Sequence, residues 1–336
     1  MNNRVTIIDV SNIAGVSTAT VSRTLHNPNV VTAKTRKAVM NAVHQTGYTQ
    51  NTAAQNLRQQ RANAILVLVP DISNTFFSEI LSGIEHVASQ ANLTTLIADT
   101  LNDAHRTENF TRYLFNGRAD GALLLNGYLP DSIVETIRNS PQNHPAIVSV
   151  SEALDDQIVP HIGIDNIQAT QMAVEHLLAK GHRFITHLSG PAGNILTSDR
   201  IKGYRNAMVA SGLNDSDQHL IQGDFSIASG EAAANDIIAM ERRPDAVFCS
   251  NDAMAIGLIS ALVNRGVAVP NDIAVMGFDD IEFARTCIPP LTTIHQPRRR
   301  IGEMAAKTLL AQLGIGDFEM PDTSSLQATL VERDSA

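Results

Sequence analysis

Hydrophobic and polar positions follow two different patterns along the chain. In residues 6–46, apolar residues recur at helical spacing in three short segments. From residue 64 onward, short apolar runs alternate with longer segments of helical periodicity. Because a strand buried on both faces reads as a continuous apolar run, this alternation is typical of repeated βα units with parallel sheets. The pattern predicts a small all-α part followed by a larger α/β part.

Two helices joined by a tight turn are predicted at the start of the chain. Thr6 and Asp9 make a helix start that resembles a capping box. Gly15 can take the positive φ that a tight turn requires, and Ser17 is a suitable N-cap for a second helix over 18–25. The apolar face of the first helix is expected to consist of Ile7, Ile8, Val10 and Ile13.

A third helix completes a helix-turn-helix pattern. The periodicity of the second helix turns Val21 and Leu25 inward. Thr32 caps a third helix over 33–46, which Gly47 ends. Two short helices joined by a glycine-containing turn, with a third beside them, are typical of DNA-reading domains. Three small helices also occur in folds that do not bind DNA, so the pattern alone leaves both interpretations open.

Charge is distributed unevenly and favours the DNA-binding interpretation. Residues 1–61 carry seven basic residues and one acid, a net charge of +6, whereas the remainder carries 18 basic and 33 acidic residues, a net charge of −15. The whole-chain net charge of −9 conceals this contrast. A basic head on an acidic body predicts that the head contacts a polyanion and that the body does not.

The α/β part contains two series of βα units, which predict two lobes with parallel sheets and right-handed crossovers. The lobes are expected to exchange chain segments near 161–166, near 288–294 and after Phe318. The predicted strands are 65–69, 94–98, 122–125, 146–150, 184–188, 219–222, 246–249, 273–276 and 326–331. The predicted helices are 77–90, 107–117, 131–139, 168–180, 199–211, 229–240, 252–264 and 301–313.

Composition and motifs exclude several classes of protein. The 336 residues predict two or three domains. No apolar run approaches the ~18–20 residues of a membrane helix, and the N-terminal residues lack the pattern of a secretory signal. Cys249 and Cys287 are too few for a disulfide framework or a zinc cluster. The chain has no phosphate-binding loop, nucleophile elbow or His-Glu-x-x-His motif. We therefore expect no catalytic residues, no metal, no cofactor and no membrane partner.

Polar residues follow several predicted strands. Open parallel sheets bind ligands beyond the carboxyl ends of their strands, and two facing sheets make a cleft that closes on a small molecule. Each polar residue taken alone is typical of a turn former or helix N-cap, and Asp252 in particular reads as the cap of the helix after it. The residues at these strand ends are Asp71, Asn74, Asp99, Asn126, Asn251, Asp279 and Asp280.

Two sets of residues carry a family resemblance: residues 6–10 and 14–23 of the head, continuing to Leu57, and residues 277–280 and 289–297 of the body. In both, the chain resembles the lactose/galactose repressor (LacI/GalR) family of transcriptional regulators. It implies an N-terminal all-α helix-turn-helix headpiece and an α/β periplasmic-binding-protein-like core of two doubly wound parallel-sheet lobes.

The resemblance also implies a domain organisation. The expected domains are a headpiece over 1–50, a hinge helix or linker over 51–61 and an effector-binding and dimerisation core over 62–336. Within the core, the expected N-lobe is about 62–161 and 292–320, and the expected C-lobe is about 162–291 and 321–336.

DNA-binding residues follow from the resemblance position by position. Arg23 is expected to read a base, and Thr18 and Ala19 match the pair of residues that selects the adjacent bases. Leu57 matches a hinge leucine that wedges into the minor groove; the alternative is a core leucine of a short amphipathic helix. The full expected set is Thr6, Ser17, Thr18, Ala19, Ser22, Arg23, Asn27, Lys34, Arg36 and Leu57.

Effector-binding residues follow in the same way. Asp279 matches an aspartate that binds paired hydroxyls, and Phe225 matches an aromatic that stacks on a purine in one branch. Phe77 is expected to cover a sugar ring, or else to be a core residue at a helix start. The loop at 149–151 lacks an aspartate that many members carry there, which puts effector contacts from it in doubt. The full expected set is Asn74, Phe76, Phe77, Arg200, Phe225, Asn251, Asp279 and Gln296.

The family resemblance implies a regulator, most similar to the cytidine repressor branch. We expect a homodimer without a tetramerising tail that binds a pseudo-palindromic operator, in the cytoplasm and with the nucleoid when bound to DNA. Its effector is expected to be a nucleoside or a pentose, with hexoses and other sugars as alternatives. A periplasmic-type receptor and an enzyme acting on a nucleoside or sugar are the competing classes. Asp279 and Asp280 could mimic a catalytic pair, but adjacent residues at a strand end usually point apart.

Overall fold

The chain divides into two compact units, Met1–Arg61 and Ala62–Ala336. The computed structural model describes residues 5–49, 61–140, 144–154, 158–213, 219–318, 322 and 326–336. Residues 51–60 of the predicted hinge, Leu57 among them, lie outside these residues. None of the helices in the described ranges is both long and apolar enough to span a bilayer.

The first unit is a three-helix domain that confirms the predicted helix-turn-helix elements. Its helices are α1 (Ile7–Ala14), α2 (Thr18–His26) and α3 (Ala33–Thr46), with a 3-10 turn η1 (Pro28–Val30) before α3. The core of this unit consists of Val10, Val21, Val39 and Ala42, all buried. One part of the prediction is wrong: Ile8 and Ile13 are 58% and 49% exposed. Because α1 has only eight residues, it turns a single stripe inward, formed by Ile7, Val10 and Ala14.

The second unit contains two parallel sheets, as predicted. The sheet of the N-lobe has the order β2-β1-β3-β4-β5, and the sheet of the C-lobe has the order β7-β6-β8-β9. A two-stranded antiparallel pair, β10 with β11, completes the described strands. The strands are β1 (Ala64–Val69), β2 (Thr94–Asp99), β3 (Gly121–Leu124), β4 (Ala146–Val150), β5 (His161–Ile162), β6 (Ile185–Ser189), β7 (His219–Gln222), β8 (Ala246–Cys249), β9 (Ala274–Met276), β10 (Thr293–His295) and β11 (Thr329–Val331).

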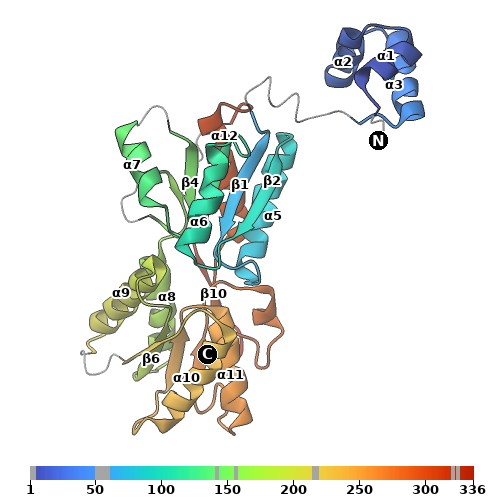
Figure 1. Cartoon of the computed structure of the whole chain (residues 1–336). Coiled ribbons are helices and arrows are strands. Elements are labelled where there is room, and N and C mark those ends of the chain that lie inside the picture. Colours follow the sequence, from blue (N-terminus) through green and yellow to red (C-terminus); the bar gives the residue numbers. More distant parts are fainter. Residues whose placement is uncertain are drawn as a thin grey trace. The chain divides into compact units, whose positions relative to one another are not determined.

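Helices cover both faces of each sheet (Figure 1). The last helix, α12, packs against α5 and the strands of the N-lobe, although the whole C-lobe lies between them in the sequence. The helices are α5 (Phe76–Gln90), α6 (Ala104–Thr111), α7 (Asp131–Asn139), α8 (Asn166–Ala179), α9 (Ile195–Ala210), α10 (Ile227–Ala239), α11 (Asp252–Asn264) and α12 (Arg298–Leu313), with 3-10 turns η2 (Arg112–Leu114) and η4 (Glu282–Arg285).

Two helices begin earlier than the sequence predicts because a polar side chain further toward the N-terminus caps them. α6 begins at Ala104, since Asp103 accepts a hydrogen bond from the backbone of Arg106, and it ends at Thr111, where η2 follows. α9 begins at Ile195 because Asn194 caps it. The strand predicted over 326–331 is shorter, beginning at Thr329.

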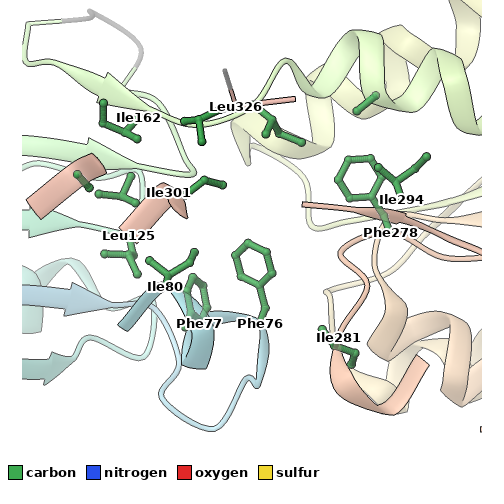
Figure 2. Close-up of a cluster of buried hydrophobic side chains, with 14 of the residues drawn as sticks. Phe76, Phe77, Ile80, Leu125, Ile162, Phe278, Ile281, Ile294, Ile301 and Leu326 are labelled. Carbon is green, nitrogen blue, oxygen red and sulfur yellow. The ribbon is translucent and has the colours of Figure 1, made fainter. Parts of the chain in front are cut away.

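The largest hydrophobic cluster runs through both lobes. From the N-lobe it includes Phe76, Phe77 and Ile80 of α5, and from the C-lobe side it includes Phe278 and Ile294 (Figure 2). Phe76 and Phe77 meet edge to face, with ring centroids 5.0 Å apart. This cluster lies where the chain passes between the lobes, so the same residues support the core and the walls of any cleft between the two sheets.

Candidate DNA-reading helix and effector cleft

The start of α1 and the turn between α1 and α2 are built from local interactions. The backbone N–H and the hydroxyl of Thr6 both donate to Asp9 Oδ2 at 2.8 Å, and these bonds lower the pKa of Asp9. Gly15 ends α1 with a φ of +66°, as predicted. The Ser17 hydroxyl accepts from the backbone N–H of Thr20 at 3.2 Å, which begins α2.

The predicted DNA-binding side chains of α2 lie on its outer surface. Thr18, Ala19 and Arg23 are exposed, whereas Val21 is fully buried on the opposite face. Arg23 Nε donates to the carbonyl of Ala19 at 3.4 Å. The rest of the predicted set in the described residues is solvent-accessible, with Thr6, Ser17, Asn27 and Lys34 exposed and Ser22 and Arg36 half-buried.

A cavity of about 1190 Å³ separates the two lobes, and a smaller one of about 40 Å³ adjoins it. Both are lined by Asn74 and Phe77 from the N-lobe and by Phe225 from the C-lobe. We call these two cavities together the cleft. The structure brings seven predicted effector residues to the smaller cavity: Asn74, Phe76, Phe77, Arg200, Phe225, Asn251 and Asp279.

Gln296 reaches the cleft only through a neighbour. It is buried and donates through Nε2 to Asp279 Oδ1 at 2.7 Å. It lines a separate cavity of about 770 Å³ next to the start of α12. Its role in this structure is therefore to hold the Asp279 carboxyl.

Arg200 is the buried cation of the cleft. Its Nε donates to Asn166 Oδ1 at 3.1 Å, its Nη1 donates to the carbonyl of Ser250, and its guanidinium lies 3.9 Å from the centre of the Phe278 ring. Its Nη2 lies 4.0 Å from Asp279 Oδ1. The arginine is thus fixed on three sides and presents its charge to Asp279.

Asp279 combines burial with an unusual backbone. Its φ of +116° lies in a region that L-residues rarely adopt, and its backbone N–H donates to the carbonyl of Ile294 on β10. Burial raises its pKa to about 6, although Arg200 and Arg298 both oppose this increase. The structure therefore holds a carboxyl at the point where the chain crosses between the lobes.

Behind Arg200, a fully buried histidine supports the same network. His187 stacks on Phe248 and Tyr204, with ring centroids 4.9 and 5.3 Å apart. Burial lowers the pKa of His187 to about 4, so the ring is neutral at physiological pH. Ser250, whose carbonyl accepts from Arg200, lies 3.4 Å from His187 Nε2 through its hydroxyl.

Several polar residues at strand ends form turns rather than open contacts. Asp71 accepts from the N–H and hydroxyl of Ser73, and Asn74 Oδ1 accepts from the N–H of Phe76. Asp99 accepts from the N–H of Leu101 and lies outside the lining of the cleft. These bonds agree with the turn-forming interpretation of such residues.

Asn251, not Asp252, caps α11, which corrects the prediction. Asn251 Oδ1 accepts from the N–H of Met254 at 2.9 Å, and its Nδ2 donates to the carbonyl of Phe225. Asp252 is fully buried and bonds to the N–H of Ile281 and the hydroxyl of Thr293, both on the crossing segment. The cap falls on Asn251 because its backbone is still extended, with φ −151° and ψ 168°.

Sequence reasoning missed Glu152, which lines both cavities of the cleft. It comes two residues after β4, in the loop that the missing aspartate had put in doubt. Burial raises its pKa to about 7, and a hydrogen bond from the Asn194 side chain and the charge of Arg200 oppose the increase. The sequence signal that could have found Glu152 is its position as the first acidic residue after β4.

These two sites define a class of protein. A basic helix-turn-helix unit, followed by two α/β lobes around a cleft with aromatic walls and a buried Arg–Asp pair, is typical of a DNA-binding regulator with a small-molecule domain. In the part of the chain that the structure describes, no three His, Cys, Asp or Glu side chains gather as a metal site.

Comparison with known proteins identifies the family. Residues 6–51 match the lacI family of bacterial regulatory proteins, and residues 174–336 match a periplasmic binding protein-like domain. The chain is 38% identical over 309 residues to the HTH-type transcriptional repressor CytR of Escherichia coli (strain K12), with 92% of this chain and 89% of CytR covered. It is 36% identical over 312 residues to PurR of Vibrio campbellii (strain ATCC BAA-1116), with 92% of each covered.

The structural comparison agrees. The crystal structure of the lac repressor dimer bound to operator and the anti-inducer ONPF matches with a TM-score of 0.85 and 28% identity, and 99% of each chain is covered. The chain therefore belongs to the lacI family of bacterial regulatory proteins. It is a DNA-binding transcriptional regulator with an effector-binding core and not an enzyme, as the sequence predicts.

Proposed function

We propose that this protein is a homodimeric repressor that acts in the cytoplasm, on the nucleoid when bound to its operator. A neutral nucleoside or sugar that binds in the cleft lowers or raises its affinity for the operator. The observation that carries the proposal is the buried set of Arg200, Asp279 and Gln296 beside Phe77 and Phe225. Aromatic faces cover the C–H-rich faces of rings, and fixed charged groups bind hydroxyls.

The charge of the cleft supports an uncharged ligand. Three carboxyl groups, those of Glu152, Asp279 and Asp252, lie around Arg200. The Nε and Nη1 donors of Arg200 are already bonded to Asn166 and Ser250. A phosphorylated or carboxylate ligand would add negative charge to this set and lose more in desolvation than it gains. A ring with adjacent hydroxyls supplies donors without charge, and the resemblance to the cytidine repressor branch favours a nucleoside.

Coupling between cleft and headpiece is proposed to run through residues 51–61. Closure of the lobes changes the separation of the two hinges in the dimer, which favours or prevents insertion of Leu57. The effector can shift operator affinity only by its different affinities for the two lobe arrangements, typically by ~1–3 kcal/mol. Sedimentation of the full chain tests the dimer, and a monomer at micromolar concentration without operator binding contradicts the proposal.

Replacing Asp279 by Asn is expected to abolish effector binding and leave operator binding without ligand intact. The amide keeps the size of the side chain and tolerates its positive φ, but it removes the charge that faces Arg200. In a thermal-shift assay with free effector at 100 times its Kd, the wild-type protein should gain about 2.7 kcal/mol of stability. A full shift in Asp279→Asn would mean that the ligand binds elsewhere.

Replacing Arg23 by Ala is expected to relax operator preference at one base pair by about 1–3 kcal/mol, because a bidentate arginine–guanine contact carries that much discrimination. Lys34, exposed in the first turn of α3, provides the comparison. Lys34→Ala should weaken all sequences alike and lower the salt dependence. Binding to operator variants by fluorescence anisotropy measures both. Uniform weakening in Arg23→Ala would make Arg23 a phosphate contact.

A further inference from the structure

Glu152 brings a carboxyl of the N-lobe into contact with the C-lobe. Strand β4 ends at Val150, and Ser151 then adopts a φ of +66°. The N–H of Ser151 donates to the carbonyl of Ile162, and the N–H of Glu152 donates to the carbonyl of Val150, both at 2.8 Å. This tight turn fixes the position from which the Glu152 side chain enters the cleft.

The neighbouring loop is shaped around this side chain. A Cβ at Gly127 would lie 2.7 Å from Glu152 Oε2 and 3.0 Å from its Cβ, so any larger residue at 127 would displace the carboxyl. On the other side, the Asn194 side chain bonds to Glu152 while its own Oδ1 caps α9. The carboxyl is thus held between a loop of the N-lobe and the helix that carries Arg200.

The surroundings of Glu152 provide few donors for its carboxylate. Arg200 is engaged by Asn166 and Ser250, and Asn194 supplies a single N–H group. Burial lowers the pKa of His161, which lies beside Ser151, so this ring is neutral at neutral pH. The charged and titratable groups around the cleft next to Glu152 are Arg200, Asp279, Asp252, Asp71, Asp224 and His161.

We propose that Glu152 is a specificity-determining residue of the effector site, where its carboxylate accepts a hydrogen bond from an amino group on the ligand's ring. The inference rests on the proposed function, because it assumes a ring held between Phe77 and Phe225 in the cleft. A carboxylate offers acceptors only, so a ring with an amino substituent completes its hydrogen bonding. A ring with a keto oxygen at the same position places two acceptors against each other.

Protonation of Glu152 reverses this preference. A protonated carboxyl donates to a keto oxygen, and an ionised one accepts from an amino group. With a pKa of about 7, the ionised fraction rises about tenfold between pH 6 and pH 8. Asp279, whose pKa is raised to about 6, titrates at the lower end of the same range and must be separated by a variant.

The test is isothermal titration calorimetry of the full chain with two pairs of nucleosides that differ in one substituent, cytidine with uridine and adenosine with inosine. In the wild type, the amino-to-keto affinity ratio should rise at least about tenfold from pH 6 to pH 8. In Glu152→Gln the ratio should stay constant, because the amide carries both a donor and an acceptor at every pH. In this variant, a pH dependence of affinity that both nucleosides of a pair share is attributed to the titration of Asp279.

Glu108→Gln is the matched control, since Glu108 lies on α6 with 46% of its side chain exposed, pairs with Arg112 and lies outside the cleft. It should keep the wild-type ratio at both pH values. Thermal unfolding without ligand checks the fold, and Glu152→Gln should melt no lower than wild type at pH 8 because it removes a buried charge. If the amino-to-keto affinity ratio still depends on pH in Glu152→Gln, the inference about Glu152 is wrong and the proposed function is unaffected. If no nucleoside binds wild type, the proposed ligand class fails and the inference fails with it.

Discussion

Replacing Arg200 by alanine should lower the free energy of unfolding by about 3–5 kcal/mol, the range measured when one partner of a buried ion pair is removed. The change removes the ion-pair partner of Asp279 and leaves the carbonyl of Ser250 without its donor from Arg200. It also removes the group that packs 3.9 Å from the Phe278 ring. Urea unfolding of the full chain measures the loss, and the effector-induced thermal shift should vanish in the same variant.

The loss in Arg200→Ala should be greater at pH 8 than at pH 5. Arg200 lowers the pKa of both Asp279 and Glu152, so its removal raises both further above their ordinary values. A carboxyl with a raised folded-state pKa contributes stability at low pH that is lost as the pH rises through that pKa. Lys202→Ala, exposed on the same helix, is the control and should change stability by less than about 0.5 kcal/mol. Equal effects of the two variants would contradict the assignment.

Replacing Gly302 by alanine should destabilise the N-lobe by about 3 kcal/mol. This loss is expected although alanine in a helix interior is more favourable than glycine by ~1 kcal/mol. A Cβ at Gly302 would lie 2.0 Å from the carbonyl oxygen of Ile80, and one at Gly83 would lie 2.1 Å from the carbonyl oxygen of Arg299. The backbones of α5 and α12 therefore touch at these two glycines. No side-chain rotation relieves the contact, so the helices must separate.

Thermal unfolding of Gly302→Ala checks this expectation against Gln312→Ala. Gln312 is exposed near the end of the same helix, so its replacement changes helix propensity without changing the packing. It should leave the melting temperature close to that of wild type. A melting temperature of Gly302→Ala above wild type would show that helix propensity outweighs the contact with α5.

Local signals were enough to predict the elements whose ends are set by their own residues. The capping box of Thr6 with Asp9, the turn at Gly15 and the cap at Ser17 all depend on residues within four positions of each other. Helix α11 and strands β4, β7 and β8 have the predicted bounds. The start of α9 was missed because its periodicity is weak, while the capping Asn194 looks like an ordinary loop residue.

Long-range packing explains what the sequence did not reveal about the cleft. Glu152 is distant in sequence from Asn194 and Arg200, and no spacing rule relates them. Asp252 was predicted as a cap because it begins a helix, but the crossing segment brings Ile281 and Thr293 to its carboxyl. The predicted residues at the smaller cavity came from the family resemblance, and their individual roles as effector contacts remain predictions.

The late position of α12 gives the two lobes different histories during synthesis. The C-lobe sheet and its helices, from α8 through β9, form one uninterrupted stretch of chain. The N-lobe begins first, but the side of α5 that packs on α12, at Gly83 and the backbone of Ile80, stays uncovered until α12 leaves the ribosome more than two hundred residues later. The N-lobe therefore starts before the C-lobe and is completed after it, and during that interval this side of α5 is open to chaperones or to a neighbouring nascent chain.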